Sequence, residues 1–226
     1  DGGDHTVFDP SGPDAAKTYR LNFLGSPPSP SGGHVPATFV DKTSSLFAGA
    51  SGLGEAVSCF VDFDLDGWTD ICDGAEIQRN RNGTSFTRFA SVIGGRTWGD
   101  FNNDGYLDVL SSTWEPGGQL RLFISSAGKS FEDKTEGSGL EGLFGGLNLV
   151  QGDYDNDGNL DFLVLRGAWL GARGRHPNSL IRNLGGLKFE DVTFSAGLAE
   201  AHYPTQTAGW SDYDNDGDLD IYIGNE

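Results

Sequence analysis

One nine-residue pattern constrains this chain more than any other feature, because it occurs four times without gaps. The pattern is D-[FY]-[DN]-x-D-G-x-x-D, and its copies, called loops 1 to 4, cover residues 62–70, 100–108, 153–161 and 212–220. Copies that start at residues 62, 100, 153 and 212 are spaced 38, 53 and 59 residues apart. Spacings of this size indicate an array of repeated supersecondary units.

The residue types in the pattern have the chemistry of a calcium site. Ca²⁺ takes about 6–8 oxygen ligands, and side chains at positions 1, 3 and 5 of a tightly curled loop converge on one point. Glycine at position 6 allows the sharp turn, the backbone carbonyl at position 7 supplies an oxygen, and an acid at position 9 closes the shell. Magnesium is less suitable because it rarely uses cages made only of protein ligands.

We therefore predict about four Ca²⁺ ions, one in each loop. The predicted ligands occupy positions 1, 3, 5, 7 and 9: Asp62, Asp64, Asp66, Trp68, Asp70, Asp100, Asn102, Asp104, Tyr106, Asp108, Asp153, Asp155, Asp157, Asn159, Asp161, Asp212, Asp214, Asp216, Asp218 and Asp220. The ligand at position 7 is the backbone carbonyl oxygen, so the side chain there is free to vary.

Three other interpretations of the loops are weaker. Asp-Gly and Asn-Asp-Gly are ordinary hairpin-turn residues, but turns alone do not require Asp at positions 1, 5 and 9 in all four copies. An EF-hand is disfavoured because no Glu stands at position 12 and strands are predicted on both sides. A tandem nonapeptide β-helix is disfavoured because the loops lie far apart in the sequence.

The charge of the chain agrees with a set of cation sites. The formal net charge is −18, and 15 of the 33 acidic residues stand at positions 1, 3, 5 and 9 of the loops, where the side chain is the ligand. Four Ca²⁺ ions would change the formal charge from −18 to −10. The sequence shows no basic footprint for nucleic acid, and an anionic membrane surface would repel it.

Short apolar segments beside each loop predict strands. They cover residues 56–61, 96–99, 147–152 and 207–211 before the loops, and 69–72, 107–110, 160–165 and 219–223 after them. Third strands are predicted at 119–124 and 179–183, and a Phe-x-Asp-x-Thr strand at 39–43, 131–135 and 189–193, with a degenerate copy at 86–89. Each unit thus has four strands, which predicts an all-β fold of β-propeller blades.

The repeat begins and ends in the middle of a blade, so it does not determine how the propeller closes. Residues 18–43 resemble the third and fourth strands of one blade, residues 207–223 the first two of another, and three whole blades lie between. These halves could close a four-bladed ring, pair between molecules, or belong to a larger propeller. We predict an N-terminal region, 1–37, with a Ser/Pro/Gly-rich linker at 25–33, and a repeat region, 38–226.

Two kinds of covalent modification are predicted near loop 1. Cys59 and Cys72 flank the loop, so they form a disulfide if their strands are antiparallel and in register; two buried thiols are the alternative. Asn82 begins an N-glycosylation sequon, which has meaning only in a secreted protein. No signal peptide and no Met are present, so we expect a processed or excised portion of a longer chain.

The motifs together resemble those of the FG-GAP/VCBS repeat family, the calcium-binding blades of integrin α-subunits. The resemblance covers roughly residues 38–226 and includes the acidic loops, residues 178–183 (NSLIRN) and residues 189–193 (FEDVT). The cartilage acidic protein and ASPIC/UnbV branch is the most similar in appearance. The resemblance implies a β-propeller, usually of about seven blades, and an extracellular location.

We expect a secreted calcium-binding module for extracellular adhesion or for protein or glycan interaction, with structural calcium. One alternative is a subunit of an extracellular fibre or coat assembled through blade edges. Another is a lyase-like polysaccharide-processing enzyme, with residues 173–176 (RGRH) as its candidate basic lip and Arg175 and His176 as the positions that test it. We expect no enzyme, because the four His are scattered and no nucleophile, phosphate-loop or zinc motif occurs.

Overall fold

The computed structural model describes residues 6–7, 19–20, 42–47, 58–73, 76–92, 95–113, 117–200 and 202–226. The chain divides into two compact units, residues 1–41 and 42–226. In the first unit, β1 (Thr6–Val7) pairs with β2 (Tyr19–Arg20) in an antiparallel ladder. The predicted linker at 25–33 and most of the predicted strand at 39–43 lie outside the described residues.

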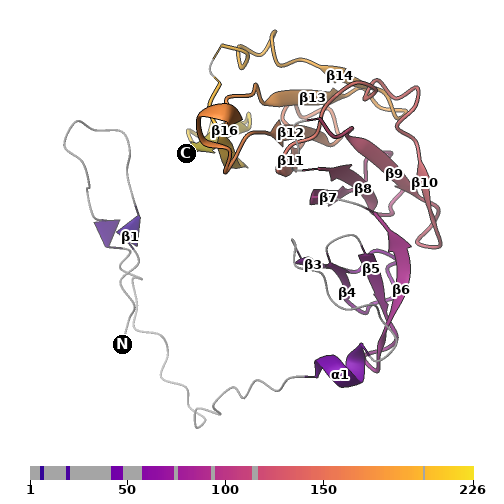
Figure 1. Ribbon diagram of the computed structural model, residues 1–226. Coiled ribbons are helices and arrows are strands. Elements are labelled where there is room, and N and C mark those ends of the chain that lie inside the picture. Colours follow the sequence, from indigo (N-terminus) through magenta and orange to yellow (C-terminus); the bar gives the residue numbers. More distant parts are fainter. Residues whose placement is uncertain are drawn as a thin grey trace. The chain divides into compact units, whose positions relative to one another are not determined.

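The second unit consists almost entirely of antiparallel sheets, as the repeat predicts (Figure 1). Sheet 1 contains β3 (Ser58–Val61), β4 (Asp70–Asp73), β5 (Glu76–Asn80) and β6 (Phe86–Ser91). Sheet 2 contains β7 (Gly95–Gly99), β8 (Asp108–Ser112), β9 (Arg121–Ser125) and β10 (Phe131–Asp133). Sheet 3 contains β11 (Asn148–Gly152), β12 (Asp161–Leu165), β13 (Ser179–Asn183) and β14 (Phe189–Asp191).

Sheet 4 has two strands, β15 (Thr205–Ser211) and β16 (Asp220–Asn225). The prediction of three whole four-stranded units followed by a half unit is therefore confirmed for residues 58–226 as far as they are described. The described residues of the second unit contain two helical elements, which are α1 (Thr43–Leu46) and the 3₁₀ helix η1 (Gly171–Gly174). Neither is long and apolar enough to cross a membrane.

One strand prediction is wrong at its described end. Thr43 was expected to end a strand, but it begins α1, where the carbonyl of Lys42 accepts hydrogen bonds from the backbone N–H groups of Ser45 and Leu46. Phe47, directly after this helical turn, stacks on Phe86 with ring centroids 4.7 Å apart. The local hydrogen bonds and this aromatic contact favour the turn over a strand.

Each acidic loop joins the first and second strands of its sheet at the same register. The residue before the loop pairs with the Asp at position 9, in the pairs Val61 with Asp70, Gly99 with Asp108, Gly152 with Asp161, and Ser211 with Asp220. Four loops of one length therefore close four hairpins in the same way.

The hydrophobic core lies between neighbouring sheets. One cluster joins sheets 1 and 2 through residues such as Phe63 and Val109. A second joins sheets 2 and 3 and includes Leu110 and Phe162, and a third joins sheets 3 and 4 around Leu163. Because each sheet buries its faces against its neighbours, stability is a nearest-neighbour property, as in other repeat proteins.

The two cysteines lie directly opposite each other. Cys59 of β3 and Cys72 of β4 are register partners, and Cys72 is buried. Opposed residues of antiparallel strands have Cα atoms about 4.5–5.5 Å apart, which is within the range of disulfides.

We expect peptide mapping under non-reducing conditions to yield Cys59 and Cys72 in one linked fragment. Loss of the link in the Cys59→Ser variant should lower the free energy of unfolding by about 3 kcal/mol, the value for a loop of roughly 15 residues. Recovery of both cysteines in separate, alkylatable peptides from the oxidised protein would contradict the disulfide.

Candidate metal centres

The four acidic loops share one backbone conformation. Position 4 has a left-handed φ in every loop: Leu65 (58°), Asn103 (60°), Asn156 (56°) and Asn215 (61°). Glycine at position 6 also has positive φ: Gly67 (86°), Gly105 (88°), Gly158 (87°) and Gly217 (99°). Residues with a Cβ rarely adopt such values, so the glycine is required by the turn itself.

Four hydrogen bonds recur in each loop, and loop 3 illustrates them. The Asp153 carboxylate accepts the backbone N–H groups of Asp157 at 3.0 Å and Gly158 at 2.9 Å. Asp157 accepts the N–H of Asn159 at 2.8 Å, and Asp161 accepts that of Tyr154 at 3.1 Å. The same donors and acceptors, by position, occur in loops 1, 2 and 4.

These bonds curl the loop around its own carboxylates. In loops 1, 3 and 4, three Asp residues each bring one carboxylate oxygen within 4.8 Å of the others. The sets are Asp62, Asp64 and Asp66; Asp153, Asp155 and Asp161; and Asp212, Asp214 and Asp220. Each set could hold a metal ion, and each belongs to the ligands predicted from sequence.

Loop 2 differs at position 3, where it has Asn102. The Asn102 amide donates to Asp104 Oδ2 at 3.0 Å, and its Oδ1 accepts the N–H of Asp104 at 3.0 Å. Asp100 and Asp108 keep the bonds that their counterparts make in the other loops. Loop 2 therefore has the same frame with one carboxylate fewer.

Two buried carboxylate oxygens provide a test of whether a cation fits. Asp64 Oδ1 and Asp155 Oδ1, both at position 3, are inaccessible and accept no hydrogen bond. A buried charged oxygen without a partner is costly, and a cation at the centre of the loop would remove that cost. Because all the side-chain donors are carboxylate or amide oxygens, the site suits a hard cation such as calcium.

The carboxylate at position 9 connects the loop to the third strand of its sheet. Asp70 Oδ1 accepts the N–H of Asn80 at 2.7 Å, Asp108 Oδ1 that of Ser125 at 2.8 Å, and Asp161 Oδ1 that of Asn183 at 2.8 Å. All three Asp side chains are buried. Burial raises the pKa of each of these carboxyls to about 6, and the other carboxylates of the same loop add to this, while the N–H groups oppose it.

Neighbouring loops also contact each other through asparagine at position 4. Asn103 of loop 2 donates to Asn159 Oδ1 at 3.0 Å, and Asn159 in turn donates to Asp157 Oδ1 at 2.9 Å. Asn156 of loop 3 donates to the carbonyl of Gly217 in loop 4 at 3.2 Å. These contacts were not predicted, because position 4 contributes no ligand and its partners are more than 50 residues away.

The remaining predicted residues lie near the loops. Trp68 at position 7 packs so closely over the β5–β6 turn that a Cβ on Gly83 would lie 2.8 Å from its ring. Asn82, the predicted glycosylation residue, is exposed in this turn. Tyr106, Asn159 and Asp218, the other residues at position 7, each donate a backbone N–H to the Asp at position 5.

A protein-family model described as an FG-GAP-like repeat matches residues 100–164, from the start of loop 2 to β12. This match supports the resemblance to the FG-GAP/VCBS repeat family that the loops and strand motifs indicate. The resemblance to the ASPIC/UnbV branch stays a prediction. A search of curated proteins found no match to the chain.

We expect Asp157→Ala to remove one bound calcium ion and to lower the melting temperature in calcium by several degrees, because position 5 is lost as a ligand. Equilibrium dialysis and calorimetry measure the two effects. Glu200→Ala, at an exposed acid outside the loops, is the control and should change neither. Unchanged stoichiometry in Asp157→Ala would contradict a site in loop 3.

We also expect the metal-free protein to become less stable as the pH rises from about 5 to 7. The carboxyls of Asp70, Asp108 and Asp161 have a pKa of about 6 in the folded protein, above the ordinary aspartate value of 3.8 that applies in the unfolded chain. Their contribution is full below pH 3.8 and is lost as the pH rises through 6. Urea unfolding in EDTA should therefore show a falling midpoint.

In saturating calcium the slope should reverse, because protons compete with the ion for the same carboxylates. A midpoint in EDTA that rises between pH 5 and 7 would contradict the buried-carboxylate account.

Proposed function

We propose that this chain, which carries an FG-GAP-like repeat, is a calcium-binding β-propeller module. It acts outside the cell, in adhesion or in interaction with a protein or a glycan. The observation that carries the proposal is the common hydrogen-bond frame of the four loops, which in loops 1, 3 and 4 gathers three carboxylate oxygens within 4.8 Å of one another. FG-GAP repeats are typically extracellular, where millimolar calcium would keep such loops occupied.

The calcium is structural in this proposal. Each loop closes the first hairpin of a sheet, and its position-9 carboxylate also holds the third strand in sheets 1 to 3. The ligands come together only in the folded chain, so calcium stabilises the native state by mass action. At a calcium concentration of 100 times Kd, one site contributes about 2.7 kcal/mol.

The test is urea unfolding as a function of free calcium. We expect the free energy of unfolding to rise with the logarithm of calcium concentration, with a slope that reflects several ions, and to respond much less to magnesium. A free energy of unfolding that is equal in calcium and in EDTA would contradict structural calcium.

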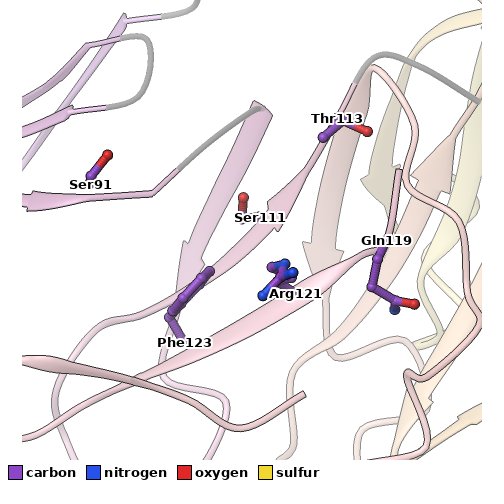
Figure 2. A pocket seen from close by; sticks show the side chains of 6 residues that line it. All are labelled: Ser91, Ser111, Thr113, Gln119, Arg121 and Phe123. Carbon is purple, nitrogen blue, oxygen red and sulfur yellow. The ribbon is translucent and has the colours of Figure 1, made fainter. Parts of the chain in front are cut away.

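A hollow away from the loops, lined by both polar and apolar side chains, is a candidate site for the partner. Its volume is about 460 Å³, and it lies between β6 and the strands β8 and β9. Figure 2 shows its lining residues, which are Ser91, Ser111, Thr113, Gln119, Arg121 and Phe123. Hydroxyl and amide groups beside one aromatic ring, together with the guanidinium group of Arg121 that pairs with Asp133, suit a glycan, whose binding should then be weakened in Arg121→Ala.

We propose binding rather than catalysis as the activity. Arg175 and His176, the residues of the lyase-like alternative, follow η1 in the connection from β12 to β13 and do not line this hollow. Cleavage of a uronate polymer that is abolished by His176→Ala would contradict the proposal and favour the enzyme.

Assembly through blade edges is a second candidate, favoured by aromatic residues exposed at both ends of the array. Tyr154 at position 2 of loop 3 stacks on Trp210 of sheet 4, with ring centroids 6.1 Å apart. The equivalent Tyr213 of loop 4 is 77% exposed. Phe60 of sheet 1, two residues before its loop as Trp210 is before loop 4, is also 77% exposed.

The same type of stack could thus form between two molecules. We expect sedimentation velocity in calcium to detect species larger than 24.1 kDa, and the Tyr213→Ser variant to reduce them. A single 24.1 kDa species at all concentrations would contradict assembly.

A further inference from the structure

An arginine from the third strand contacts the position-3 carboxylate in loops 1 and 3. Arg79 Nε lies 2.7 Å from Asp64 Oδ2, and Arg182 Nη2 lies 2.6 Å from Asp155 Oδ2. Arg182 Nη2 is also 3.8 Å from Asp157 Oδ2, at position 5. Both arginines thus act directly on the group of carboxylates that would hold the ion.

The two arginines occupy the same place in their sheets. Each directly precedes the residue whose N–H bonds the position-9 carboxylate, which is Asn80 in β5 and Asn183 in β13. In β9 the equivalent N–H donor is Ser125, and the residue before it is Ile124. The sheet of loop 2 therefore has Ile124 at the place where the other two sheets have an arginine. Loop 2 is also the loop with Asn102 instead of Asp at position 3.

Loop 2 differs from loops 1 and 3 by one missing carboxylate and one missing arginine, and these two differences cancel in formal charge. Loops 1 and 3 each have four ligand Asp residues and one contacting arginine, which gives a formal charge of −3. Loop 2 has three ligand Asp residues, and no arginine of the described residues forms an ion pair with them, which also gives −3. The Asp64 and Asp155 side chains are only 10% and 21% exposed, so water screens these charges incompletely.

The arginines also determine which oxygen remains for an ion. In Asp64 and Asp155 the Oδ2 atom faces the arginine, while Oδ1 is the buried oxygen without a partner. Arg79 is itself held in place, because it donates to the carbonyl of Gly128 at 2.7 Å and lies 4.4 Å from the centre of the Phe89 ring. One oxygen of each carboxylate is thus neutralised while the other stays available.

We propose that Arg79 and Arg182 are positioning residues that set the charge of metal sites 1 and 3 to the value that site 2 reaches without an arginine. The three sites then bind calcium with similar affinity, although their residues differ. This inference rests on the proposed calcium binding of the loops. The position-3 residue and the residue before the third-strand N–H donor act as one pair: Asp with Arg, or Asn with Ile.

The test is made in the full chain. It replaces the Asp155 and Arg182 pair of loop 3 with Asn and Ile, the residues that loop 2 has at the same places. Asp155→Asn leaves a formal charge of −2, Arg182→Ile leaves −4, and the double variant restores −3 with the residues that site 2 uses. Calcium is titrated while the amide signal of Gly158 is followed by NMR, since this residue belongs to loop 3 alone.

We expect Asp155→Asn to weaken calcium binding at loop 3 about tenfold and Arg182→Ile to strengthen it about tenfold, by the attraction between the ion and one unit charge. The double variant should return to within about threefold of wild type. In EDTA, Arg182→Ile should lower the urea midpoint through carboxylate repulsion, and the double variant should recover most of it. Both effects should shrink in high salt.

A merely structural arginine would behave differently, because the losses of the two single variants would then add in the double variant. Weaker calcium binding in Arg182→Ile, or a double variant no better than Asp155→Asn, would overturn the proposal. Arg88→Ile is the matched control, since Arg88 lies in β6 and pairs with Glu76 instead of a loop residue; it should leave the loop 3 affinity unchanged. Absence of calcium binding in the wild type would instead overturn the proposed function.

Discussion

In loops 1 to 3, a buried carboxylate at position 9 connects the acidic loop to the third strand of its sheet. In loop 2, Asp108 accepts the N–H of Phe101 with one oxygen and the N–H of Ser125, in the third strand, with the other. The side chain is fully buried, and other carboxylates lie in the same loop. The two N–H groups stabilise the charged form, and a proton or a cation would neutralise the charge that remains. Loops 1 to 3 thus each concentrate negative charge around a buried carboxylate that bonds to the third strand of its sheet.

The arrangement explains why the chain tolerates so much negative charge. Carboxylates that would repel one another on an open surface are concentrated where N–H groups, arginines and a cation can offset them. The contacts from Asn103 to Asn159 and from Asn156 to Gly217 place successive loops next to each other. A structural change in one loop is therefore expected to affect the stability of the neighbouring loops. This coupling adds to the one through the hydrophobic core between sheets.

The sequence was sufficient to predict the loops and most strands, because both have short-range signals. The predicted strand at 179–183 coincides with β13, and the degenerate motif at 86–89 lies within β6. The strands β10 and β14 end two residues before the predicted end, since Asp133 and Asp191 bond the N–H and hydroxyl groups of Thr135 and Thr193. The partners of the loops could not be predicted, because Arg79 reaches Asp64 only when β5 pairs with β4, and Asn103 reaches Asn159 only when sheets 2 and 3 pack. The repeated Arg-Asn at 79–80 and 182–183 was the one available signal.

Native mass spectrometry of the chain in millimolar calcium tests the central claim most directly. The account predicts a mass increase equal to about four Ca²⁺ ions, reached in a narrow concentration range and reversed by EDTA. Substitution at position 5 of a single loop should reduce the increase by one ion. A mass that stays that of the metal-free chain, or a broad distribution of adducts unaffected by these substitutions, would contradict the account.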